Sequence, residues 1–269
     1  MIKLSIGMIV LNEEEFIEKN LKQHYNWSHA TVHQIIIIEG AVNLFPKRNI
    51  TEGGLSTDRT AEIIKAFPDP EKKITFVQGY WKNKVEQRNE YTKRVRDDTD
   101  YLLVIDCDEF YTQGNQFKIT QLINNHKNIH SFQIPQIHLW KSFNRQVVGG
   151  YWAVPHTRLY KWSPGCQYDQ NHNEIIGPDG HNYHQRDAGY YQVQLNEAYC
   201  LHFGFFRSTK FCRDKQDFYY NRGEIQTRPM YSICREAWFD WKEGDPLPRG
   251  TKLYPYNNEV PEVFSDKGG

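Results

Sequence analysis

Apolar runs and segments of helical periodicity alternate along the first part of the chain. Four apolar runs have the length and composition of strands covered on both faces: residues 4–11, 32–38, 73–78 and 100–105. The segments between them predict three helices: residues 13–25, 57–67 and 83–96. Strands that alternate with helices form a parallel sheet with right-handed crossovers. We therefore predict an α/β fold with a Rossmann-type, mainly parallel sheet flanked by helices.

The pattern changes in residues 111–269, which are rich in Tyr, Trp, His, Pro and Gly and have only short periodic segments. Three elements are predicted there: a helix at 117–126, a strand at 131–139 and a helix at 211–222. The last would turn three aromatic side chains inward: Phe211, Phe218 and Tyr219. Because no linker or repeat separates the halves, we expect residues 1–269 to form a single domain whose second half completes the same sheet.

Acidic or amide side chains follow three of the four predicted strands: Asn12, Glu39 and Asp106. In open sheets of this kind, ligands bind at the carboxyl ends of the strands. A strand with a purely structural role gives no reason to gather such groups at one edge. The sequence therefore predicts a ligand site at this edge of the sheet.

The sequence Asp106-Cys107-Asp108-Glu109 comes directly after the apolar run that ends at Ile105. Two carboxylates at positions i and i+2, just past a strand end, can hold one hard divalent cation, and that cation can bind a diphosphate from its other side. The alternative is a solvated acidic turn. The position after five apolar residues favours a metal site formed by Asp106 and Asp108.

Five motifs in chain order resemble the family-2 glycosyltransferases of the GT-A fold. They are Asn12-Glu13 after the first strand, Glu39 at the end of the second, Ser56-Thr57-Asp58-Arg59-Thr60 at a helix start, Arg88-Asn89, and Asp106-Cys107-Asp108. The resemblance covers residues 4–110. It implies a nucleotide-sugar-binding half, residues 1–110, and an acceptor-side half, residues 111–269. The family usually has Asp in place of Glu39 and Gly in place of Arg59, so the base contact and this turn can differ here.

The resemblance implies that five residues bind the nucleotide sugar: Asn12, Glu39, Asp58, Arg88 and Asp106. Three of them, Glu39, Asp58 and Arg88, have another interpretation. Glu39 at a strand end can contact a base or ribose, or be a surface acid. Asp58 can cap its helix, touch the nucleotide, or do both. Arg88 can contact the diphosphate, pair with Glu39 or Asp58, or be solvated.

A third metal ligand is suggested by His202, which stands in His202-Phe203-Gly204 before a basic segment. The resemblance implies that this histidine completes the shell of Asp106 and Asp108, and carboxylates with a neutral imidazole suit manganese. The predicted cofactor is Mn²⁺ or Mg²⁺. The alternative is a histidine satisfied in the core. Lys215 and Arg213 are candidates to steady the diphosphate.

Inverting transfer, which the resemblance implies, needs a general base beside the acceptor hydroxyl. Some family members carry His-Glu after an Arg-Leu-Phe/Tyr segment. This chain has Arg158-Leu159-Tyr160 followed by Asn171-His172-Asn173-Glu174, with Asn173 interrupting the pair. Glu174 is therefore the predicted base. Three other acids compete with it: Asp169, Asp187 and Glu197.

Charge, hydropathy and cysteine spacing narrow the range of partners that the protein is expected to have. The net charge of +0 argues against a nucleic acid held by its phosphates. No stretch approaches the ~18 apolar residues of a membrane helix, and the apolar start of the chain has no cleavage pattern of a signal peptide. The five cysteines are scattered without a CxxC pair, so no disulfide framework or zinc site is indicated. We expect a cytoplasmic enzyme, with peripheral membrane contact possible.

The predicted activity moves a sugar from a nucleotide-diphosphate donor to a glycan, protein or lipid-linked acceptor. Aromatic residues of the second half can stack on sugar rings, although most belong in a core: Trp140, Tyr151, Trp152, Trp162, Trp238 and Trp241. Three alternatives remain: a non-catalytic sugar-binding module, a catalytically inactive relative, and a sugar nucleotidyltransferase. The last should have a Gly-rich phosphate loop after the first strand, where this chain has three consecutive glutamates.

Overall fold

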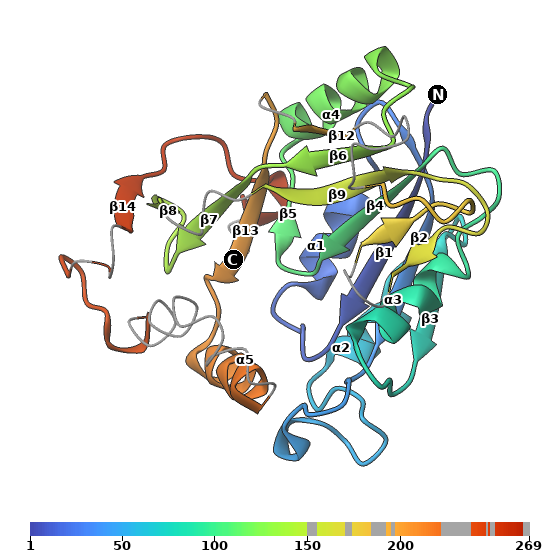
Figure 1. The fold of residues 1–269 in the computed structure, drawn as a ribbon. Coiled ribbons are helices and arrows are strands. Elements are labelled where there is room, and N and C mark those ends of the chain that lie inside the picture. The colour runs from blue at the N-terminus through green and yellow to red at the C-terminus, as the bar shows by residue number, and fades with distance from the viewer. Residues whose placement is uncertain are drawn as a thin grey trace.

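The computed structural model describes residues 1–149, 155–169, 174–183, 192–194, 197–221, 238–245, 247 and 251–265. A seven-stranded sheet with the order β12-β6-β9-β4-β1-β2-β3 lies at its centre (Figure 1). Its strands are β1 (Lys3–Val10), β2 (Thr31–Glu39), β3 (Ile74–Gln78), β4 (Tyr101–Asp106), β6 (Ser131–Ile134), β9 (His156–Lys161) and β12 (Gln192–Gln194). Neighbouring strands are parallel except where β9 pairs with β4 and β6. The predicted α/β fold with a mainly parallel sheet is confirmed.

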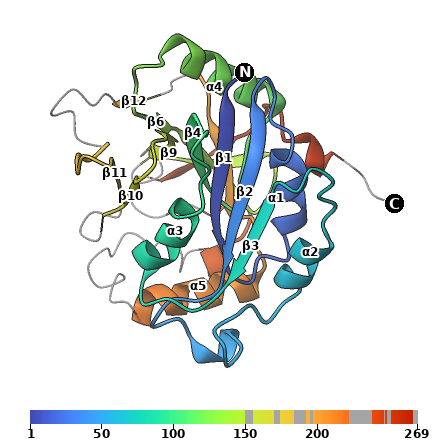
Figure 2. The same ribbon diagram turned by 90° about the vertical axis from the view of Figure 1, so that its right-hand side faces the viewer.

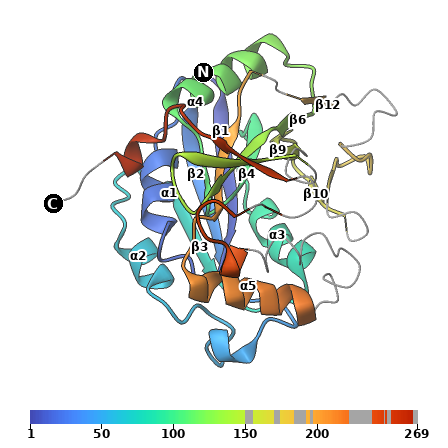
Figure 3. The same ribbon diagram turned by 90° about the vertical axis from the view of Figure 1, so that its left-hand side faces the viewer.

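Helices flank this sheet on both faces. They are α1 (Ile17–His24), α2 (Thr60–Ala66), α3 (Lys84–Thr92), α4 (Gln113–Asn125) and α5 (Thr209–Asn221). α1 and α2 cover one face, and α3 covers the other (Figure 2). α5 lies at the end of the molecule opposite α4, next to the carboxyl ends of β1 and β2 (Figure 3). Two short 3-10 helices, η1 (Lys47–Asn49) and η4 (Glu262–Phe264), complete the helical elements that the structure describes.

The four consecutive isoleucines of β2 explain how that strand fits between the two helical layers. Successive side chains of a strand point to opposite faces of the sheet. Ile35 and Ile37 belong to the hydrophobic core that contains Leu21 of α1, whereas Ile36 and Ile38 belong to the core that contains α3 side chains. A strand buried on both faces is therefore apolar at every position, as the sequence indicates.

The second half does more than complete the large sheet. It supplies β6, β9 and β12, as expected, but it also builds most of a separate five-stranded sheet beside the first (Figure 1). This second sheet has the order β14 (Lys252–Pro255), β8 (Arg145–Val148), β7 (Gln136–Trp140), β13 (Cys200–Phe205) and β5 (Glu109–Phe110). A two-stranded sheet pairs β10 (Gln167–Tyr168) with β11 (Ile175–Ile176).

The single strand predicted at residues 131–139 is wrong, because the segment forms two strands in different sheets. β6 ends at Ile134 and β7 begins at Gln136, with Pro135 between them. Proline has no N–H to donate to a ladder, so it interrupts pairing at this point. The chain uses the interruption to pass from the large sheet to the small one.

All five predicted helices form, but their bounds differ from the predicted ones by up to four residues at an end. α1 begins at Ile17 rather than 13, and α3 ends at Thr92 rather than 96. α4 begins at Gln113 rather than 117, because the Thr112 side chain accepts a hydrogen bond from the Asn115 backbone N–H at 3.2 Å and caps the helix earlier. α5 begins at Thr209, and of its three predicted inward aromatics only Phe218 is buried. Among the helices described here, none is both long and apolar enough to cross a membrane.

Candidate functional site

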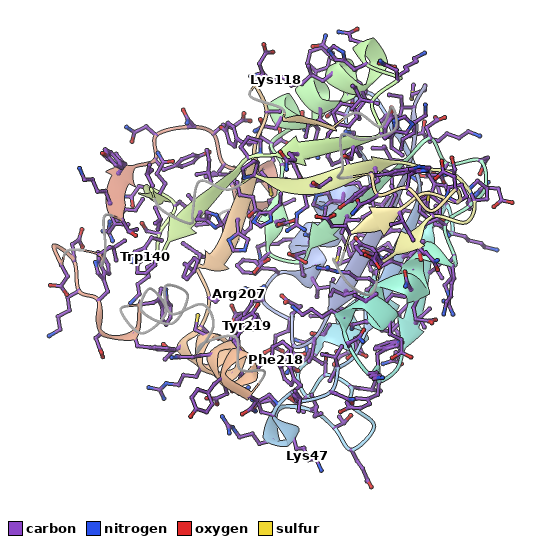
Figure 4. The ribbon with its side chains drawn as sticks, in the orientation of Figure 1. Lys47, Lys118, Trp140, Arg207, Phe218 and Tyr219 are labelled. Carbon is purple, nitrogen blue, oxygen red and sulfur yellow. The ribbon has the colours of Figure 1, made fainter. Side chains whose placement is uncertain are left out.

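A cavity of about 670 Å³ lies at the carboxyl ends of β1, β2 and β4. Its walls are the segment after β1, residues 40–42 after β2, Asp106 to Asp108 after β4, and side chains of α3 and α5. Phe218 and Tyr219 on α5 line it, and Arg207 stands just before that helix (Figure 4). The cavity is therefore where the strand order predicts a ligand site.

The turn after β1 is fixed by polar contacts with the segment before α2. Asn12 has a positive φ of 55°, and its side-chain oxygen accepts a hydrogen bond from the Thr57 backbone N–H at 2.8 Å. Asp58 accepts hydrogen bonds from the Thr60 N–H at 3.0 Å and from the Glu14 N–H at 3.1 Å. Asn12 and Asp58 both line the cavity, so Asp58 combines its local structural contacts with a place in the wall.

Glu39 supports the cavity from below. It is fully buried, so the interpretation of a surface acid is wrong. Its carboxylate accepts hydrogen bonds from the Ser56 N–H at 2.6 Å and from the Gln78 amide at 2.8 Å. Glu39 itself is not part of the cavity wall, whereas the next residue, Gly40, is. In this arrangement Glu39 holds together the strand ends on which the wall is built.

Asp106 and Asp108 have different surroundings, although both line the cavity. The Asp106 side chain is 40% exposed and accepts a hydrogen bond from Arg158 Nη2 at 2.9 Å. Burial raises the pKa of Asp106, but the charges of Arg158 and Arg88 outweigh it and lower the pKa to about 2. The Asp106 backbone N–H donates to Glu109 Oε2 at 3.0 Å, so Glu109 fixes the start of this turn.

The Asp108 side chain is only 4% exposed and faces three cationic or basic groups. Arg207 Nη2 lies 3.3 Å from Oδ2, Lys215 Nζ lies 3.8 Å from Oδ2, and His202 Nε2 lies 3.8 Å from Oδ1. Burial opposes ionisation, but Lys215, His202 and Arg207 together hold the pKa of Asp108 well below its usual range. Asp108 is therefore a carboxylate at neutral pH.

Arg207 joins the turn after β1 to the acidic turn after β4. Its fully buried side chain forms an ion pair with Glu13 and lies between the rings of Phe16 and Phe211, at 4.4 and 4.0 Å from their centroids. Burial raises the pKa of Glu13 to about 7; Arg207 opposes this rise and Asp108 adds to it. The guanidinium therefore sits between two carboxyl groups, those of Glu13 and Asp108.

Five cationic residues line the cavity: Arg59 before α2, Lys84 and Arg88 on α3, and Lys210 and Lys215 on α5. Lys84 and Arg88 lie one turn apart. Lys84 Nζ stands 5.6 and 5.7 Å from the ring centroids of Phe218 and Tyr219. Although Tyr219 opposes it, burial together with the charges of Arg88 and Lys215 lowers the pKa of Lys84. Positive groups that repel one another in this way are arranged to receive an anion.

α5 is tied across the cavity to the loop after β2. Arg48 forms an ion pair with Asp217, and the Asn221 amide donates to the Leu44 carbonyl at 3.4 Å. Phe45 also contacts Phe218, with ring centroids 5.0 Å apart. Because Phe45 and Phe218 both line the cavity, this contact forms part of its wall.

The fit of a divalent metal rests on Asp108 and His202. Asp108 Oδ2 faces Arg207 and Lys215, whereas Oδ1 faces His202 Nε2 at 3.8 Å. Burial lowers the pKa of His202 to about 4, despite the opposing charge of Asp108, so the imidazole is neutral and has a lone pair to offer. Asp106 turns instead toward Arg158. Within the described residues, no three His, Cys, Asp or Glu side chains converge as a ready-made metal site.

Two protein ligands still suit a metal that shares its shell with a nucleotide. Mg²⁺ at such sites keeps several waters and is held by one or two carboxylates together with substrate phosphates. The residues present therefore fit Mg²⁺ or Mn²⁺ held by Asp108 and His202 with diphosphate oxygens. The assignment of Asp106, Asp108 and His202 as ligands stays a prediction.

The predicted general base lies away from the cavity wall. Glu174 Oε2 accepts a hydrogen bond from the Asn182 amide at 2.6 Å, and the Glu174 carbonyl accepts from the Asp169 N–H at 2.7 Å. Neither Glu174 nor Asp169 lines the cavity. Glu197 is exposed, and Asp187 lies outside the described residues.

Of the two residues predicted to steady the diphosphate, Lys215 lines the cavity and Arg213 does not.

Of the four described aromatic residues that the sequence offers for stacking on sugars, three belong to hydrophobic cores. Trp140, Trp162 and Trp238 are buried, and Trp241 is half-buried. Tyr151 and Trp152 lie outside the described residues. The three buried tryptophans therefore have the structural role that the sequence left as the alternative.

Sequence reasoning gave no role to four residues that shape the site: Glu13, Lys84, Arg158 and Arg207. Glu13 and Arg207 are 194 positions apart, and no local pattern announces such a pair. Lys84 had one available signal, because it stands four residues before Arg88 on a predicted helix and therefore on the same face. Arg158 was noticed only as part of a motif, without a partner.

Comparisons with known proteins find similarity in structure only. No protein-family model matches the sequence, and no curated protein matches it. The chain is similar to S. aureus TarS in complex with UDP, with 13% identity and a TM-score of 0.45 over 88% of this chain and 70% of that one. For TarS in complex with UDP-GlcNAc the identity is 12% and the TM-score 0.47, over 89% and 71%.

A further similar structure is 4-diphosphocytidyl-2C-methyl-D-erythritol synthase from Anaerococcus prevotii. It shares 11% identity at a TM-score of 0.33, over 60% of this chain and 70% of that one. These low values transfer no residue role to the present chain. The functional argument therefore rests on the residues of the cavity.

Proposed function

We propose that this protein is a glycosyltransferase that moves a sugar from a nucleoside-diphosphate sugar to a hydroxyl group of an acceptor glycan, protein or lipid-linked sugar. One observation carries the proposal. At the carboxyl ends of parallel strands, one cavity brings the carboxylates of Asp106 and Asp108 together with cationic side chains of α3 and α5, among them Lys84, Arg88 and Lys215. A diphosphate bound with a divalent cation requires both kinds of group.

The cavity has room for such a donor. Its volume of about 670 Å³ falls within the roughly 300–1,000 Å³ that is typical of small-molecule sites. The nucleoside would lie between the turn at Asn12 and residues 40–42, against the ring of Phe45. The diphosphate would lie between Arg88 and Lys215. We propose that Asn12, Asp58, Arg88 and Asp106 contact the donor directly, and that Glu39 shapes the floor beneath it.

A divalent cation, Mn²⁺ or Mg²⁺, would be held by Asp108 and His202. When bound, it supplies neutralisation of the charge that develops on the leaving diphosphate. The chain's own cations contribute to the same end, because the half-buried side chains of Lys84, Arg88 and Lys215 line the same cavity. Lys215, His202 and Arg207 together keep Asp108 ionised.

We propose direct displacement, in which the acceptor oxygen bonds to the anomeric carbon as the bond to the diphosphate breaks, with inversion. The acceptor proton passes to a general base, for which Glu174 remains the proposed residue. Its carboxylate is held by Asn182 beside the β10–β11 sheet, and β10 packs against α3. We propose that the base acts from the side of the large sheet on which α3 and Arg88 lie.

A donor screen tests this function. The purified protein is incubated with a panel of nucleotide sugars, with Mn²⁺, Mg²⁺ or EDTA, and release of free nucleoside diphosphate is measured. We expect metal-dependent release from one donor, and a loss of about 100-fold or more in Asp108→Asn. Asp97→Asn, at an exposed acid away from the cavity, is the matched control and should retain wild-type turnover.

Other outcomes select other functions. No turnover, together with no thermal stabilisation by any nucleoside diphosphate plus metal, would favour a sugar-binding module or an inactive relative. Pyrophosphate release from a nucleoside triphosphate and a sugar phosphate would favour a nucleotidyltransferase. Turnover that survives EDTA would refute the metal assignment and leave the transferase.

A further inference from the structure

His138 and His202 form a histidine pair behind the cavity. They are directly opposite each other on the parallel strands β7 and β13. Their Nδ1 atoms lie 2.9 Å apart and their ring centroids 4.7 Å apart. His138 is buried, with only 7% of the residue exposed. At this distance the two rings share a hydrogen bond, so one Nδ1 carries a proton and the other accepts it.

The other side of the His202 ring is equally confined. Its Nε2 atom faces Asp108, with 3.8 Å to Oδ1. The ring lies over the Cα of Gly204, where a Cβ would come within 2.2 Å of His202 Cε1. The backbone N–H of Phe203 donates to the Asp108 carbonyl at 2.8 Å, which joins β13 to the acidic turn. Three contacts therefore fix the ring: His138 behind it, Gly204 beside it and Asp108 in front.

We infer that His138 is a positioning residue that prepares His202 to bind a divalent cation together with Asp108. The inference rests on the proposed function. An imidazole nitrogen binds a metal through its lone pair, and Nε2 is the nitrogen of His202 that faces Asp108. The proton of a neutral His202 must then be on Nδ1. The acceptor for that proton is His138 Nδ1, at 2.9 Å.

Histidine ligands in other metal sites are held by a comparable hydrogen bond. A ligating histidine usually donates its second N–H to a carboxylate, a backbone carbonyl or water, which fixes its tautomer and orientation. Here a second imidazole takes that role. Because His138 holds the ring from the core side of β7, the ring cannot turn away from Asp108 without breaking the bond.

Two substitutions of His138 separate positioning from packing. His138→Asn places a side-chain oxygen near the former Nδ1 and keeps an acceptor, whereas His138→Leu removes it. Mn²⁺ is titrated into wild type and both variants, and free Mn²⁺ is measured by electron paramagnetic resonance, without any donor. We expect His138→Leu to weaken Mn²⁺ binding by about 10- to 100-fold and His138→Asn to retain most of it. His181→Leu, at an exposed histidine, is the control.

A measurement on the unaltered protein keeps the inference testable if His138→Leu fails to fold. Long-range ¹H–¹⁵N NMR spectra report the tautomer of each histidine, with Zn²⁺ as a diamagnetic probe. We expect His202 protonated at Nδ1 and His138 at Nε2. A wild-type protein that binds no Mn²⁺, equal Mn²⁺ affinity in wild type and His138→Leu, or His202 protonated at Nε2 with Zn²⁺ bound, would each overturn the inference.

The two proposals can fail separately. If Mn²⁺ binding depends on His138 but no nucleotide sugar is turned over, the proposed function fails and the positioning role holds. If a donor is turned over with Mn²⁺ but both His138 variants bind the metal as wild type does, only the positioning role fails.

Discussion

Arg158 and Glu109 form a buried ion pair directly beneath the carboxylate of Asp106. The same guanidinium nitrogen of Arg158 contacts both acids. Gln136 donates a second hydrogen bond to Glu109, and the remaining Glu109 oxygen accepts from the Asp106 backbone N–H. Burial raises the pKa of Glu109, and the charge of Arg158 opposes that rise. Asp106 is thus oriented from inside the protein, by a pair that does not line the cavity.

Removing one partner of this pair should cost more than removing both. Arg158→Met leaves Glu109 buried without its counter-charge, and we expect the free energy of unfolding to fall by about 3–5 kcal/mol. In the double variant Arg158→Met with Glu109→Gln, no buried charge is left unpaired, so much of that loss should be recovered. Chemical denaturation of the two variants and of Glu109→Gln alone completes the cycle. A double variant no more stable than Arg158→Met would contradict this account.

Lys84 should contribute to donor binding at a cost to the empty protein. Like charges four residues apart on a helix destabilise it by roughly 0.2–0.5 kcal/mol, and Lys84 stands in that relation to Arg88. Lys84→Met should therefore raise the unfolding temperature slightly. It should also weaken nucleoside-diphosphate binding by about 10- to 100-fold, the loss of one hydrogen bond to a charged group. Calorimetric titration checks the second effect.

Lys82→Met is the matched control for that experiment, because Lys82 is an exposed lysine just before the same helix and does not line the cavity. It should leave nucleotide binding nearly unchanged. Equal losses in the two variants would show that only the general positive charge of this region matters.

Gly204 should be intolerant of any side chain. A Cβ there would lie 2.2 Å from the His202 ring, which is too close for the ring to stay in place. We expect Gly204→Ala to lower stability by about 1–3 kcal/mol and to weaken Mn²⁺ binding through the displaced imidazole. Gly53→Ala is the control, because a Cβ at Gly53 meets no atom within 4 Å. Thermal unfolding without metal and Mn²⁺ titration separate the two effects, and unchanged values for both would count against the ring position described.

Glu13 should make the free energy of unfolding depend on pH between its pKa in the unfolded chain and its pKa in the folded protein. Its pKa is about 7 in the folded protein, against an ordinary value of 4.5. The folded state therefore binds more protons in this window, and this carboxyl contributes stability that is full below pH 4.5 and lost as the pH rises through 7. The difference in unfolding free energy between wild type and Glu13→Gln isolates this group. That difference should fall steadily from pH 4.5 to 7, and a rise would mean that the pKa is lowered instead.

The sequence was sufficient where burial on both faces left a continuous apolar run. β1, β2 and β4 were predicted for that reason, and the polar residues that follow β1 and β4 meet at one cavity because parallel strands end at the same edge. Short strands with mixed composition escaped prediction. β8 and β14 pair mainly with each other across more than a hundred residues, and their pattern reflects this partner rather than a local period.

The chemistry of the site was predictable only in its acids. Asp106 and Asp108 stand beside each other in the chain, so their spacing carries the signal. Their counter-charges do not: Arg158 comes from an antiparallel strand, and Arg207 and Lys215 come from the far end of the chain. Which cation meets which carboxylate depends on how β9 and α5 pack, and a single sequence has no local feature that records it.

The position of α5 has a consequence for the order in which the site is completed during synthesis. Glu13 emerges from the ribosome early, Asp108 follows, and Arg207 comes 194 residues after Glu13. Because a domain generally folds as a unit and the chain is made from its N-terminal end, the two acids stay in water until their guanidinium partner has been synthesised. A fragment that stops before Arg207 would keep these acids hydrated and the donor site open, so the donor site is among the last parts of the protein to be completed.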